Sequence, residues 1–456
     1  MPSRLCLLAL AVAGAAAAPF QLSGPRRLRQ DAAGGAILLP LSRHLVEAPQ
    51  RAGAADVAPR SYYVGNIRVG GDDGAPQELL VFFDTGSGQV ILDSTRCGAA
   101  PCLRRHRYSP IASHAQNVKA DGLAVRRGAK GDSAHVHLDS HDEAGSGEIA
   151  GDLVRDRVCL GAERTAASSR AEVCTDLDFM AVTNMTMEPF MSTPFDGIVG
   201  LGLEGLSIGP DFSFFGRLAK RGGGLPAPHF ALFLPPVDQG DRAEVAFGGH
   251  NPARLASPLS WVPVAQPEKG FWQVSISSVS AGDGSVNLCP EGCRGVLDSS
   301  SSRLGVPEEA LPKLEAALAL AAPDARGECT GADIRLTLDG GITLTLTARD
   351  YAERSGSKCI PLFHPVTSED QQRAGRMADH GGIVRSGGFG DPTFILGEPL
   401  LRRYYTVFDW EAKRLGFGLA AAATADAAAA EVHSGAEEFI LLQCKAERRP
   451  AKVMVD

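Results

Sequence analysis

Two short segments of this 456-residue chain share one pattern, an apolar run that ends in an aspartate and then turns through small hydroxylated residues. The first occupies residues 81–87 and the second residues 295–301, so Asp84 and Asp298 stand 214 positions apart. A short apolar run bounded by turn residues is typical of a buried strand. Two such strand–turn units, brought face to face, place two carboxylates side by side.

A second repeated segment supports a duplication. Residues 195–202 (FDGIVGLG) and 394–397 (FILG) each place two apolar residues before a glycine. These glycines, Gly200 and Gly397, follow Asp84 and Asp298 by 116 and 99 positions. The same order in both halves predicts two duplicated lobes with the active cleft between them.

The remaining pattern is that of a mostly β protein. Residues 62–69 and 77–83 read as successive strands, and short strands with glycine-rich turns recur to about Leu419. A helix is expected over residues 307–321, because Pro307 followed by two glutamates is a good helix start. The net charge of −8 lacks the basic excess that phosphate binding needs, which argues against nucleic acid as a main partner.

The N-terminal region divides into two segments. Residues 1–18 carry one arginine, an apolar run and a small-residue end, as in a secretory signal peptide. The alternative is a membrane anchor, although the run is shorter than the ~20 residues that a span needs. Residues 19–58 are interpreted as a pro-segment, with a disordered linker as the alternative. Arg43 is the candidate for placing a cation near the aspartates, and Arg60 precedes a candidate maturation cut.

The rest of the chain is divided into an N-terminal lobe at residues 59–252, a C-terminal lobe at 253–420 and an Ala-rich, charged tail at 421–456 with no assigned function. No other stretch is long and apolar enough to span a bilayer, so no stable membrane span is expected after signal removal.

Ten cysteines fit an oxidising secretory route, and spacing alone does not fix how they pair. Cys6 belongs to the signal segment, Cys444 is left over, and Cys159 and Cys174 are placed to staple a hairpin. A zinc site is disfavoured because the cysteines do not form two nearby pairs with matching spacing.

Two further features are candidates for modification or metal binding. Asn184 begins a glycosylation sequon, Asn-Met-Thr. His135, His137 and His141 are close in sequence, but alternation along a strand explains the first two better than metal binding does. No metal is expected.

From Ser61 to Leu419 the chain resembles the pepsin-like aspartic endopeptidases, peptidase family A1. Residues 83–87 match the first catalytic loop of that family, and residues 195–202 match its most recognisable internal segment. The resemblance implies a mostly β, bilobal pepsin-like acid protease fold with two duplicated β-lobes and the active cleft between them. It also places disulfides at Cys97–Cys102, Cys289–Cys293 and Cys329–Cys359.

The resemblance assigns the chemistry to Asp84 and Asp298. Two carboxylates within hydrogen-bonding distance share one proton, so the ionised one activates a water and the protonated one donates to the substrate carbonyl. Which aspartate carries the proton stays open. No cofactor is needed, and a peptide or protein substrate and a monomer are expected. The resemblance also implies supporting residues. Thr85 and Ser299 are expected to bond between the two loops, and Ser87 and Ser301 to hold the outer carboxylate oxygens. Gly86 is expected to allow close backbone approach.

Three departures from the family pattern stand out. Ser300 replaces the glycine expected after Asp298-Ser299, which costs stability if the backbone there needs a positive φ. The flap that covers substrate falls on Ala144, Gly145, Ser146 and Gly147, so Ala144 stands where the family has its tyrosine. The tryptophan that bonds this tyrosine is replaced by Ile91.

The sequence therefore predicts an aspartic endopeptidase, made as a zymogen, that is secreted or delivered to a lysosome- or vacuole-like compartment. The alternative is a catalytically inactive relative that keeps the cleft as a peptide- or protein-binding module.

Overall fold

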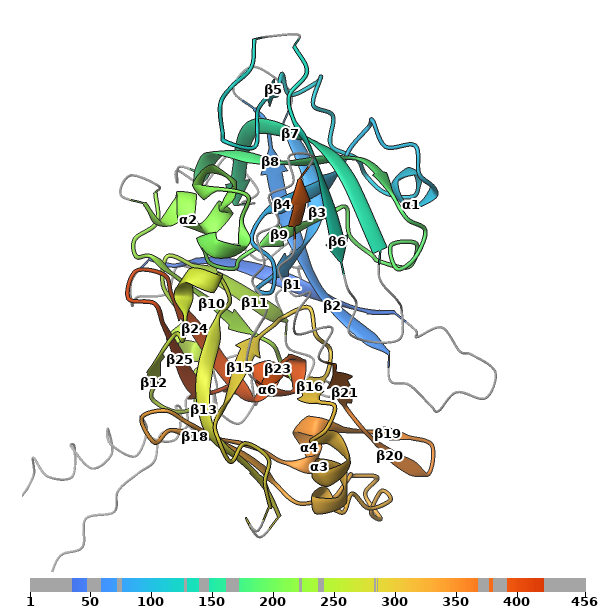
Figure 1. Cartoon of the computed structure of the whole chain (residues 1–456), viewed down its shortest axis with the longest axis vertical. Coiled ribbons are helices and arrows are strands. Elements are labelled where there is room, and N and C mark those ends of the chain that lie inside the picture. The colour runs from blue at the N-terminus through green and yellow to red at the C-terminus, as the bar shows by residue number, and fades with distance from the viewer. Residues whose placement is uncertain are drawn as a thin grey trace, which may run out of the picture.

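The computed structural model is mostly β and divides into an upper and a lower half in the view of Figure 1. No helix in the described part of the chain has the length and apolarity needed to cross a membrane. The signal segment, Ala144 to Ser146, His141, Cys6, Cys444 and the tail beyond Ala421 lie outside the described residues. The structure describes residues 35–46, 59–71, 76–126, 129–138, 147–160, 172–220, 224–236, 242–282, 284, 286–367, 377–379 and 392–421.

The N-terminal half folds around one twisted sheet with short helices at its side. Its strands are β2 (Arg60–Val69), β3 (Gln77–Asp84), β4 (Val90–Asp93), β5 (Gln116–Asn117), β6 (Ser133–Leu138), β7 (Gly147–Leu160), β8 (Cys174–Met185) and β9 (Gly197–Gly200). Its helical segments are α1 (Ala100–Leu103), η1 (Glu204–Leu206), η2 (Pro210–Phe212) and α2 (Phe214–Ala219).

The C-terminal half has its own sheet, with a small two-stranded ribbon beside it. Its strands are β13 (Gln273–Ala281), β14 (Val286–Asn287), β15 (Cys293–Leu297), β16 (Leu304–Pro307), β17 (Ile334–Leu338), β18 (Thr343–Leu346), β19 (Ala352–Ser355), β20 (Lys358–Pro361), β21 (Phe363–Val366) and β23 (Thr393–Leu396). Its helices are α3 (Leu311–Leu318), α4 (Ala348–Tyr351) and α6 (Glu398–Arg403). A short strand from this half, β22 (Met377–Asp379), pairs with β6 of the other half.

A third layer joins the halves, with strands from both. It contains β10 (His229–Phe233), β11 (Ala243–Phe247), β12 (Ser260–Pro263), β24 (Tyr404–Asp409) and β25 (Arg414–Leu419), with η3 (Pro252–Arg254) and η4 (Pro267–Lys269) in its connections. Because β10 pairs with β24, the expected lobe boundary at residue 252 does not separate two independent sheets. Phe230 and Phe408 stack across this pair with ring centroids 4.4 Å apart.

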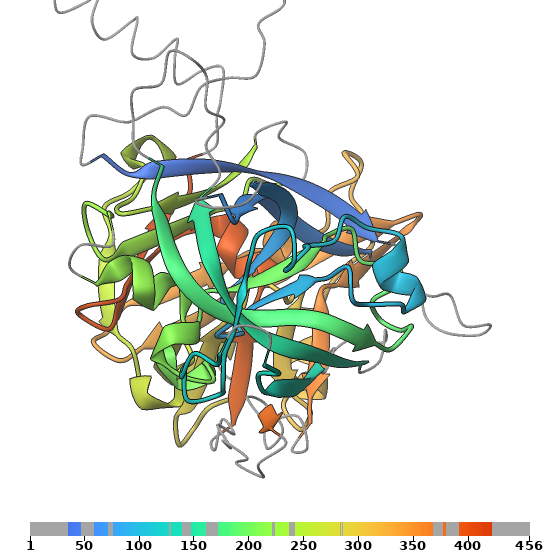
Figure 2. The same cartoon turned by 90° about the horizontal axis from the view of Figure 1, so that it is seen from above.

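The strand β1 (Ile37–Val46) ties this shared layer to the N-terminal sheet, and it runs across the molecule in Figure 2. Its first five residues pair with β11 and its last five with β2. Leu38, Leu39 and Leu41 are buried, so this part of the predicted pro-segment belongs to the folded core. The candidate cut after Arg60 falls inside β2, where Ser61 is buried and paired, and this argues against cleavage there.

The predicted duplication is present in the strand topology. In the N-terminal half β3 runs parallel to β9, and β9 pairs antiparallel with β4. In the C-terminal half β15 runs parallel to β23, and β23 pairs antiparallel with β16. The helix expected at residue 307 begins instead at Leu311, because Pro307 is the last residue of β16 and pairs with Val366 of β21.

Candidate active site

The first aspartate loop is held from behind by the glycine of the internal segment. Asp84 ends the buried strand β3, and it lies opposite Gly200 of β9 in the parallel register. The Leu201 amide donates to the Asp84 carbonyl oxygen at 2.7 Å. A Cβ at Gly200 would lie 2.6 Å from the backbone nitrogen of Gln89, so the loop packs this closely only against glycine.

The second loop repeats this arrangement. Asp298 follows β15, and its amide donates to the carbonyl oxygen of Leu396 in β23 at 3.3 Å. A Cβ at Gly397 would come within 2.3 Å of the Ser301 carbonyl oxygen. The two glycine-containing segments that the sequence singles out therefore support the two aspartate loops in equivalent ways.

The two loops interlock through Thr85 and Ser299. The Thr85 amide donates to the Ser299 hydroxyl at 3.0 Å, and the Ser299 amide donates to the Thr85 hydroxyl at 3.0 Å. Each hydroxyl also donates into the opposite strand, Thr85 to the Leu297 carbonyl oxygen at 2.9 Å and Ser299 to that of Phe83 at 2.8 Å. Both side chains are buried, so these four bonds hold the loops in one register.

This interlock brings the two carboxyl groups together. A Cβ at Gly86, beside Asp84, would lie 2.9 Å from Asp298 Oδ1 and 3.0 Å from Asp298 Oδ2. Glycine at position 86 is therefore what allows the first loop to approach the second carboxylate. Burial, and then the negative charge of Asp298, raise the pKa of Asp84 to about 7. Two carboxyl groups in this relationship share a proton over part of the pH range.

Residues 62–420 match the family described as eukaryotic aspartyl protease. The chain belongs to the eukaryotic aspartyl protease family. Among its relatives, Mus musculus napsin-A is 27% identical over 404 residues, which cover 85% of this chain and 83% of napsin-A. Cavia porcellus cathepsin E is 25% identical over 367 residues (78% and 80%), and Homo sapiens gastricsin is 25% identical over 366 residues (79% and 81%).

The hydroxyl groups around the two aspartates differ from the expectation at Ser301 and at Ser87. The Ser301 hydroxyl donates to the Arg303 carbonyl oxygen at 2.8 Å and does not hold the Asp298 carboxylate. Ser300 does so instead, through its amide at 2.8 Å and its hydroxyl at 2.7 Å, both to Oδ1. The Ser87 hydroxyl lies beside the Asp84 carboxyl and acts to lower its pKa, but its oxygen makes no regular hydrogen bond to any described residue.

Ser300 fits the loop without backbone strain. The described non-glycine residues with a positive φ are His114, Gln266, Ala319 and Lys413, and Ser300 is not among them. Its side chain is exposed beside the buried Asp298. The departure from glycine therefore adds a hydroxyl at the site without requiring a left-handed backbone.

The flap region is described only in part. β6 and β7 form its hairpin, with Leu138 opposite Gly147, and Ala144, Gly145 and Ser146 lie outside the described residues. Ile91 is buried in β4. His135 and His137 alternate on β6 with the buried Ala134 and Val136, as strand geometry requires.

The candidate pro-segment cation, Arg43, is held by a hydroxyl and a buried glutamate. Arg43 donates to the Ser61 hydroxyl at 3.0 and 2.7 Å, and its Nε lies 3.5 Å from Glu398 Oε1. Glu398 also accepts hydrogen bonds from the Tyr63 hydroxyl and from Arg402. Arg43 therefore has a buried glutamate as its ionic partner in the described part of the chain, and its expected role near the aspartates stays a prediction.

This cluster around Glu398 reaches the second aspartate loop, and the sequence did not reveal this contact. The Glu398 amide donates to the Ser301 carbonyl oxygen at 2.8 Å, and the Ser61 amide donates to the Ser302 hydroxyl at 2.9 Å. The sequence did contain a signal for this cluster. An acid at the start of a helix is followed, about one turn later, by two arginines at positions 402 and 403.

Four disulfides are formed within the described ranges, and they join the pairs singled out above. Their sulfur atoms lie 2.02–2.05 Å apart in Cys97–Cys102, Cys159–Cys174, Cys289–Cys293 and Cys329–Cys359. Among the described residues, the grouping with metal-ligand geometry is Cys159, Glu172 and Cys174, and its two cysteines already form a disulfide. Asn184 lies exposed in β8.

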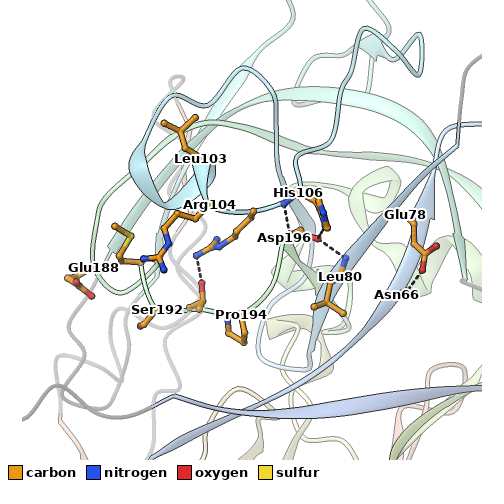
Figure 3. Close-up of a pocket in the computed structure, with 13 residues that line it drawn as sticks. Asn66, Glu78, Leu80, Leu103, Arg104, His106, Glu188, Ser192, Pro194 and Asp196 are labelled. Atoms are coloured by element: carbon orange, nitrogen blue, oxygen red, sulfur yellow. Dashed lines mark hydrogen bonds and ion pairs between the residues drawn. The ribbon is translucent and has the colours of Figure 1, made fainter.

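A separate hollow of about 1120 Å³ lies on the N-terminal half, and its lining includes neither aspartate of the dyad (Figure 3). Asp196 at its wall accepts hydrogen bonds from the amides of Leu80 at 2.9 Å and His106 at 3.0 Å. Arg105 donates to Asp93 at 2.9 Å. These bonds fix the loop after α1, so Asp196 and Arg105 have structural partners.

Proposed function

We propose that this chain is an aspartic endopeptidase. The observation that carries the proposal is the interlock of Thr85 and Ser299, which presents the Asp84 and Asp298 carboxyl groups to each other across the two loops. A cleft of this kind binds an extended peptide through backbone hydrogen bonds and side-chain pockets. The substrate class is therefore peptide or unfolded protein.

The dyad hydrolyses the amide bond in two stages. The ionised carboxylate takes a proton from water as the oxygen attacks the carbonyl carbon, and the protonated carboxyl gives its proton to the carbonyl oxygen. The tetrahedral intermediate then collapses: one of its hydroxyl groups returns a proton to the ionised carboxylate, the C–N bond breaks, and the leaving nitrogen takes a proton from the protonated carboxyl. Neither aspartate is consumed, and the pair returns to one proton.

Four disulfides indicate an oxidising compartment, so we place the protein in the secretory pathway. A zymogen is part of the proposal, with the removable part N-terminal to Ile37, because β1 is built into the fold. Asn184 is the proposed glycosylation site, since it is exposed.

The test is cleavage of an unfolded protein at about pH 4 to 6, where the dyad holds one proton. Activity is expected to fall as the pH rises through about 7, because Asp84 is then ionised. Cleavage should disappear in Asp84→Asn and be blocked by a peptide that mimics the transition state, which an assembled dyad binds tightly. Peptide binding without turnover in the wild type would instead favour an inactive binding module.

A further inference from the structure

The two carboxyl groups of the dyad receive different numbers of hydrogen bonds. Asp298 Oδ1 accepts two, from the Ser300 amide and the Ser300 hydroxyl. Asp84 Oδ1 accepts one, from the Gly86 amide at 2.8 Å, and the nearby Ser87 hydroxyl makes no regular hydrogen bond to this carboxyl. The two residues are equally buried, at 8% exposed for Asp84 and 9% for Asp298. The asymmetry therefore comes from the donors and not from burial.

The additional donor is the side-chain hydroxyl of Ser300, and the matching residue of the first loop, Gly86, has no side chain. Gly86 and Ser300 both follow the aspartate by two residues, and both donate their amide to the aspartate Oδ1. A glycine at position 300 would supply that amide alone. The hydroxyl of the next residue, Ser301, cannot replace it, because it already donates to Arg303.

We propose that Ser300 is a positioning residue that holds the single negative charge of the dyad on Asp298 and leaves the shared proton on Asp84. A hydrogen bond to an ionised acceptor is about twice as strong as one between neutral groups, so the second donor favours the carboxylate form of Asp298. The proposal rests on the proposed function only for its catalytic consequence. Asp298 then takes the proton from water, and Asp84 donates its proton to the substrate carbonyl oxygen.

The electrostatics of Asp84 agree with this assignment. Burial and the charge of Asp298 both raise its pKa, and they outweigh the opposing effects of Ser87 and Gly86. A proton on Asp84 also removes the repulsion between two neighbouring carboxylates, since the charge of Asp298 acts on Asp84.

The first test does not require activity. The full-length protein is labelled with ¹³C at the aspartate carboxyl carbons, and the dyad signals are assigned with Asp84→Asn and Asp298→Asn. At a pH where the dyad holds one proton, the wild-type Asp298 signal should be that of a carboxylate and the Asp84 signal that of a protonated carboxyl. In Ser300→Ala and Ser300→Gly the lower midpoint of the pair should rise by about one to two pH units. The upper midpoint should stay, because Asp298 is ionised on both sides of it.

Two variants provide matched controls. Ser300→Thr keeps the hydroxyl and should keep both midpoints. Ser301→Ala removes the neighbouring hydroxyl, which donates to Arg303, and should move neither midpoint. Ionisation of Asp84 before Asp298, or an unmoved lower midpoint in both Ser300→Ala and Ser300→Gly, would overturn the proposal.

The second test is the pH profile of peptide cleavage. The acidic limb should move to higher pH in Ser300→Ala by the same amount as the lower midpoint, and Ser300→Thr should restore it. A wild type that cleaves nothing but titrates as described would refute the proposed endopeptidase and leave the role of Ser300 intact. An active enzyme whose acidic limb is unchanged in Ser300→Ala would refute the role of Ser300 and leave the endopeptidase intact.

Discussion

Thr85 and Ser299, 214 positions apart, exchange hydrogen bonds in which the amide of each donates to the hydroxyl of the other at 3.0 Å. Each of these hydroxyls also donates to the strand that carries the other loop. The dyad geometry therefore depends on two small buried side chains as much as on the aspartates themselves.

Replacing Thr85 by valine keeps the shape of the side chain but removes its hydroxyl. The buried Ser299 amide and the Leu297 carbonyl then lose their partner, so the free energy of unfolding should fall by about 1–3 kcal/mol. Urea denaturation measures the loss, and Thr85→Ser should recover most of it. Adding Ser299→Ala to Thr85→Val should cost less than the sum of the single changes, since the loss of either hydroxyl already loosens the pairing of the same two loops. Additive losses would show that the two hydroxyls act independently.

Asp84 should make stability depend on pH in a defined direction. Its folded pKa, about 7, lies above the reference value of 3.8, so folding favours the protonated form. The contribution of Asp84 to the free energy of unfolding is then fully present below about pH 4 and is lost as the pH rises toward 7. Asp84→Asn should be more stable than the wild type at pH 7 by on the order of 1–3 kcal/mol, and equal to it near pH 4. Thermal unfolding across this range tests it, with the exposed Glu291→Gln as control. A variant that is less stable at pH 7 would contradict the raised pKa.

The backbone atoms packed around Gly397 leave no room for a side chain at this position. A Cβ there would lie 2.3 Å from the carbonyl oxygens of both Ser301 and Arg303, which are backbone atoms and cannot turn away. Gly397→Ala should therefore destabilise the protein by about 1–3 kcal/mol or more, and displace the second aspartate loop. At Gly98 a Cβ would meet nothing within 4 Å, so Gly98→Ala serves as control. Equal stabilities of the two variants in urea would be inconsistent with this packing.

The buried cluster around Glu398 predicts unequal effects of its arginines. Arg402→Met leaves the buried Glu398 with a weaker set of partners and should cost about 3–5 kcal/mol of unfolding free energy. Arg43 is more exposed, with 24% of its side chain accessible, and Arg43→Ala should cost at most about 1 kcal/mol. The pH dependence of activation should be the same in Arg43→Ala as in the wild type, because Arg43 contacts Glu398 and not the dyad. A changed activation pH would restore a role for Arg43 at the aspartates.

The local features of this protein were predictable, and the long-range ones were not. The apolar run of residues 36–41 was visible in the sequence, but its partners in β11 and β2 lie in distant parts of the chain. Pro307 has the chemistry of a helix start, yet pairing with Val366 keeps it in β16. In both cases a partner far away in the sequence decided between two locally acceptable states.

The serines beside Asp298 also show which features the sequence predicts and which depend on the fold. The sequence places serines at positions 299 to 302, and nothing in their order says which hydroxyl reaches the carboxylate. The backbone after Asp298 turns the Ser301 hydroxyl toward Arg303 and the Ser300 hydroxyl toward Asp298. The expected support by Ser301 was therefore wrong, although the residue types were right.

The sequence by itself determined the two aspartate loops, the glycines behind them and the mostly β character, because each depends on a few neighbouring residues of fixed chemistry. Tertiary structure decided that β1 joins the N-terminal sheet to the shared layer, that Glu398 holds Arg43, and that Ser300 bonds Asp298. These outcomes depend on where distant backbone segments come to rest, and only the packed fold fixes those positions.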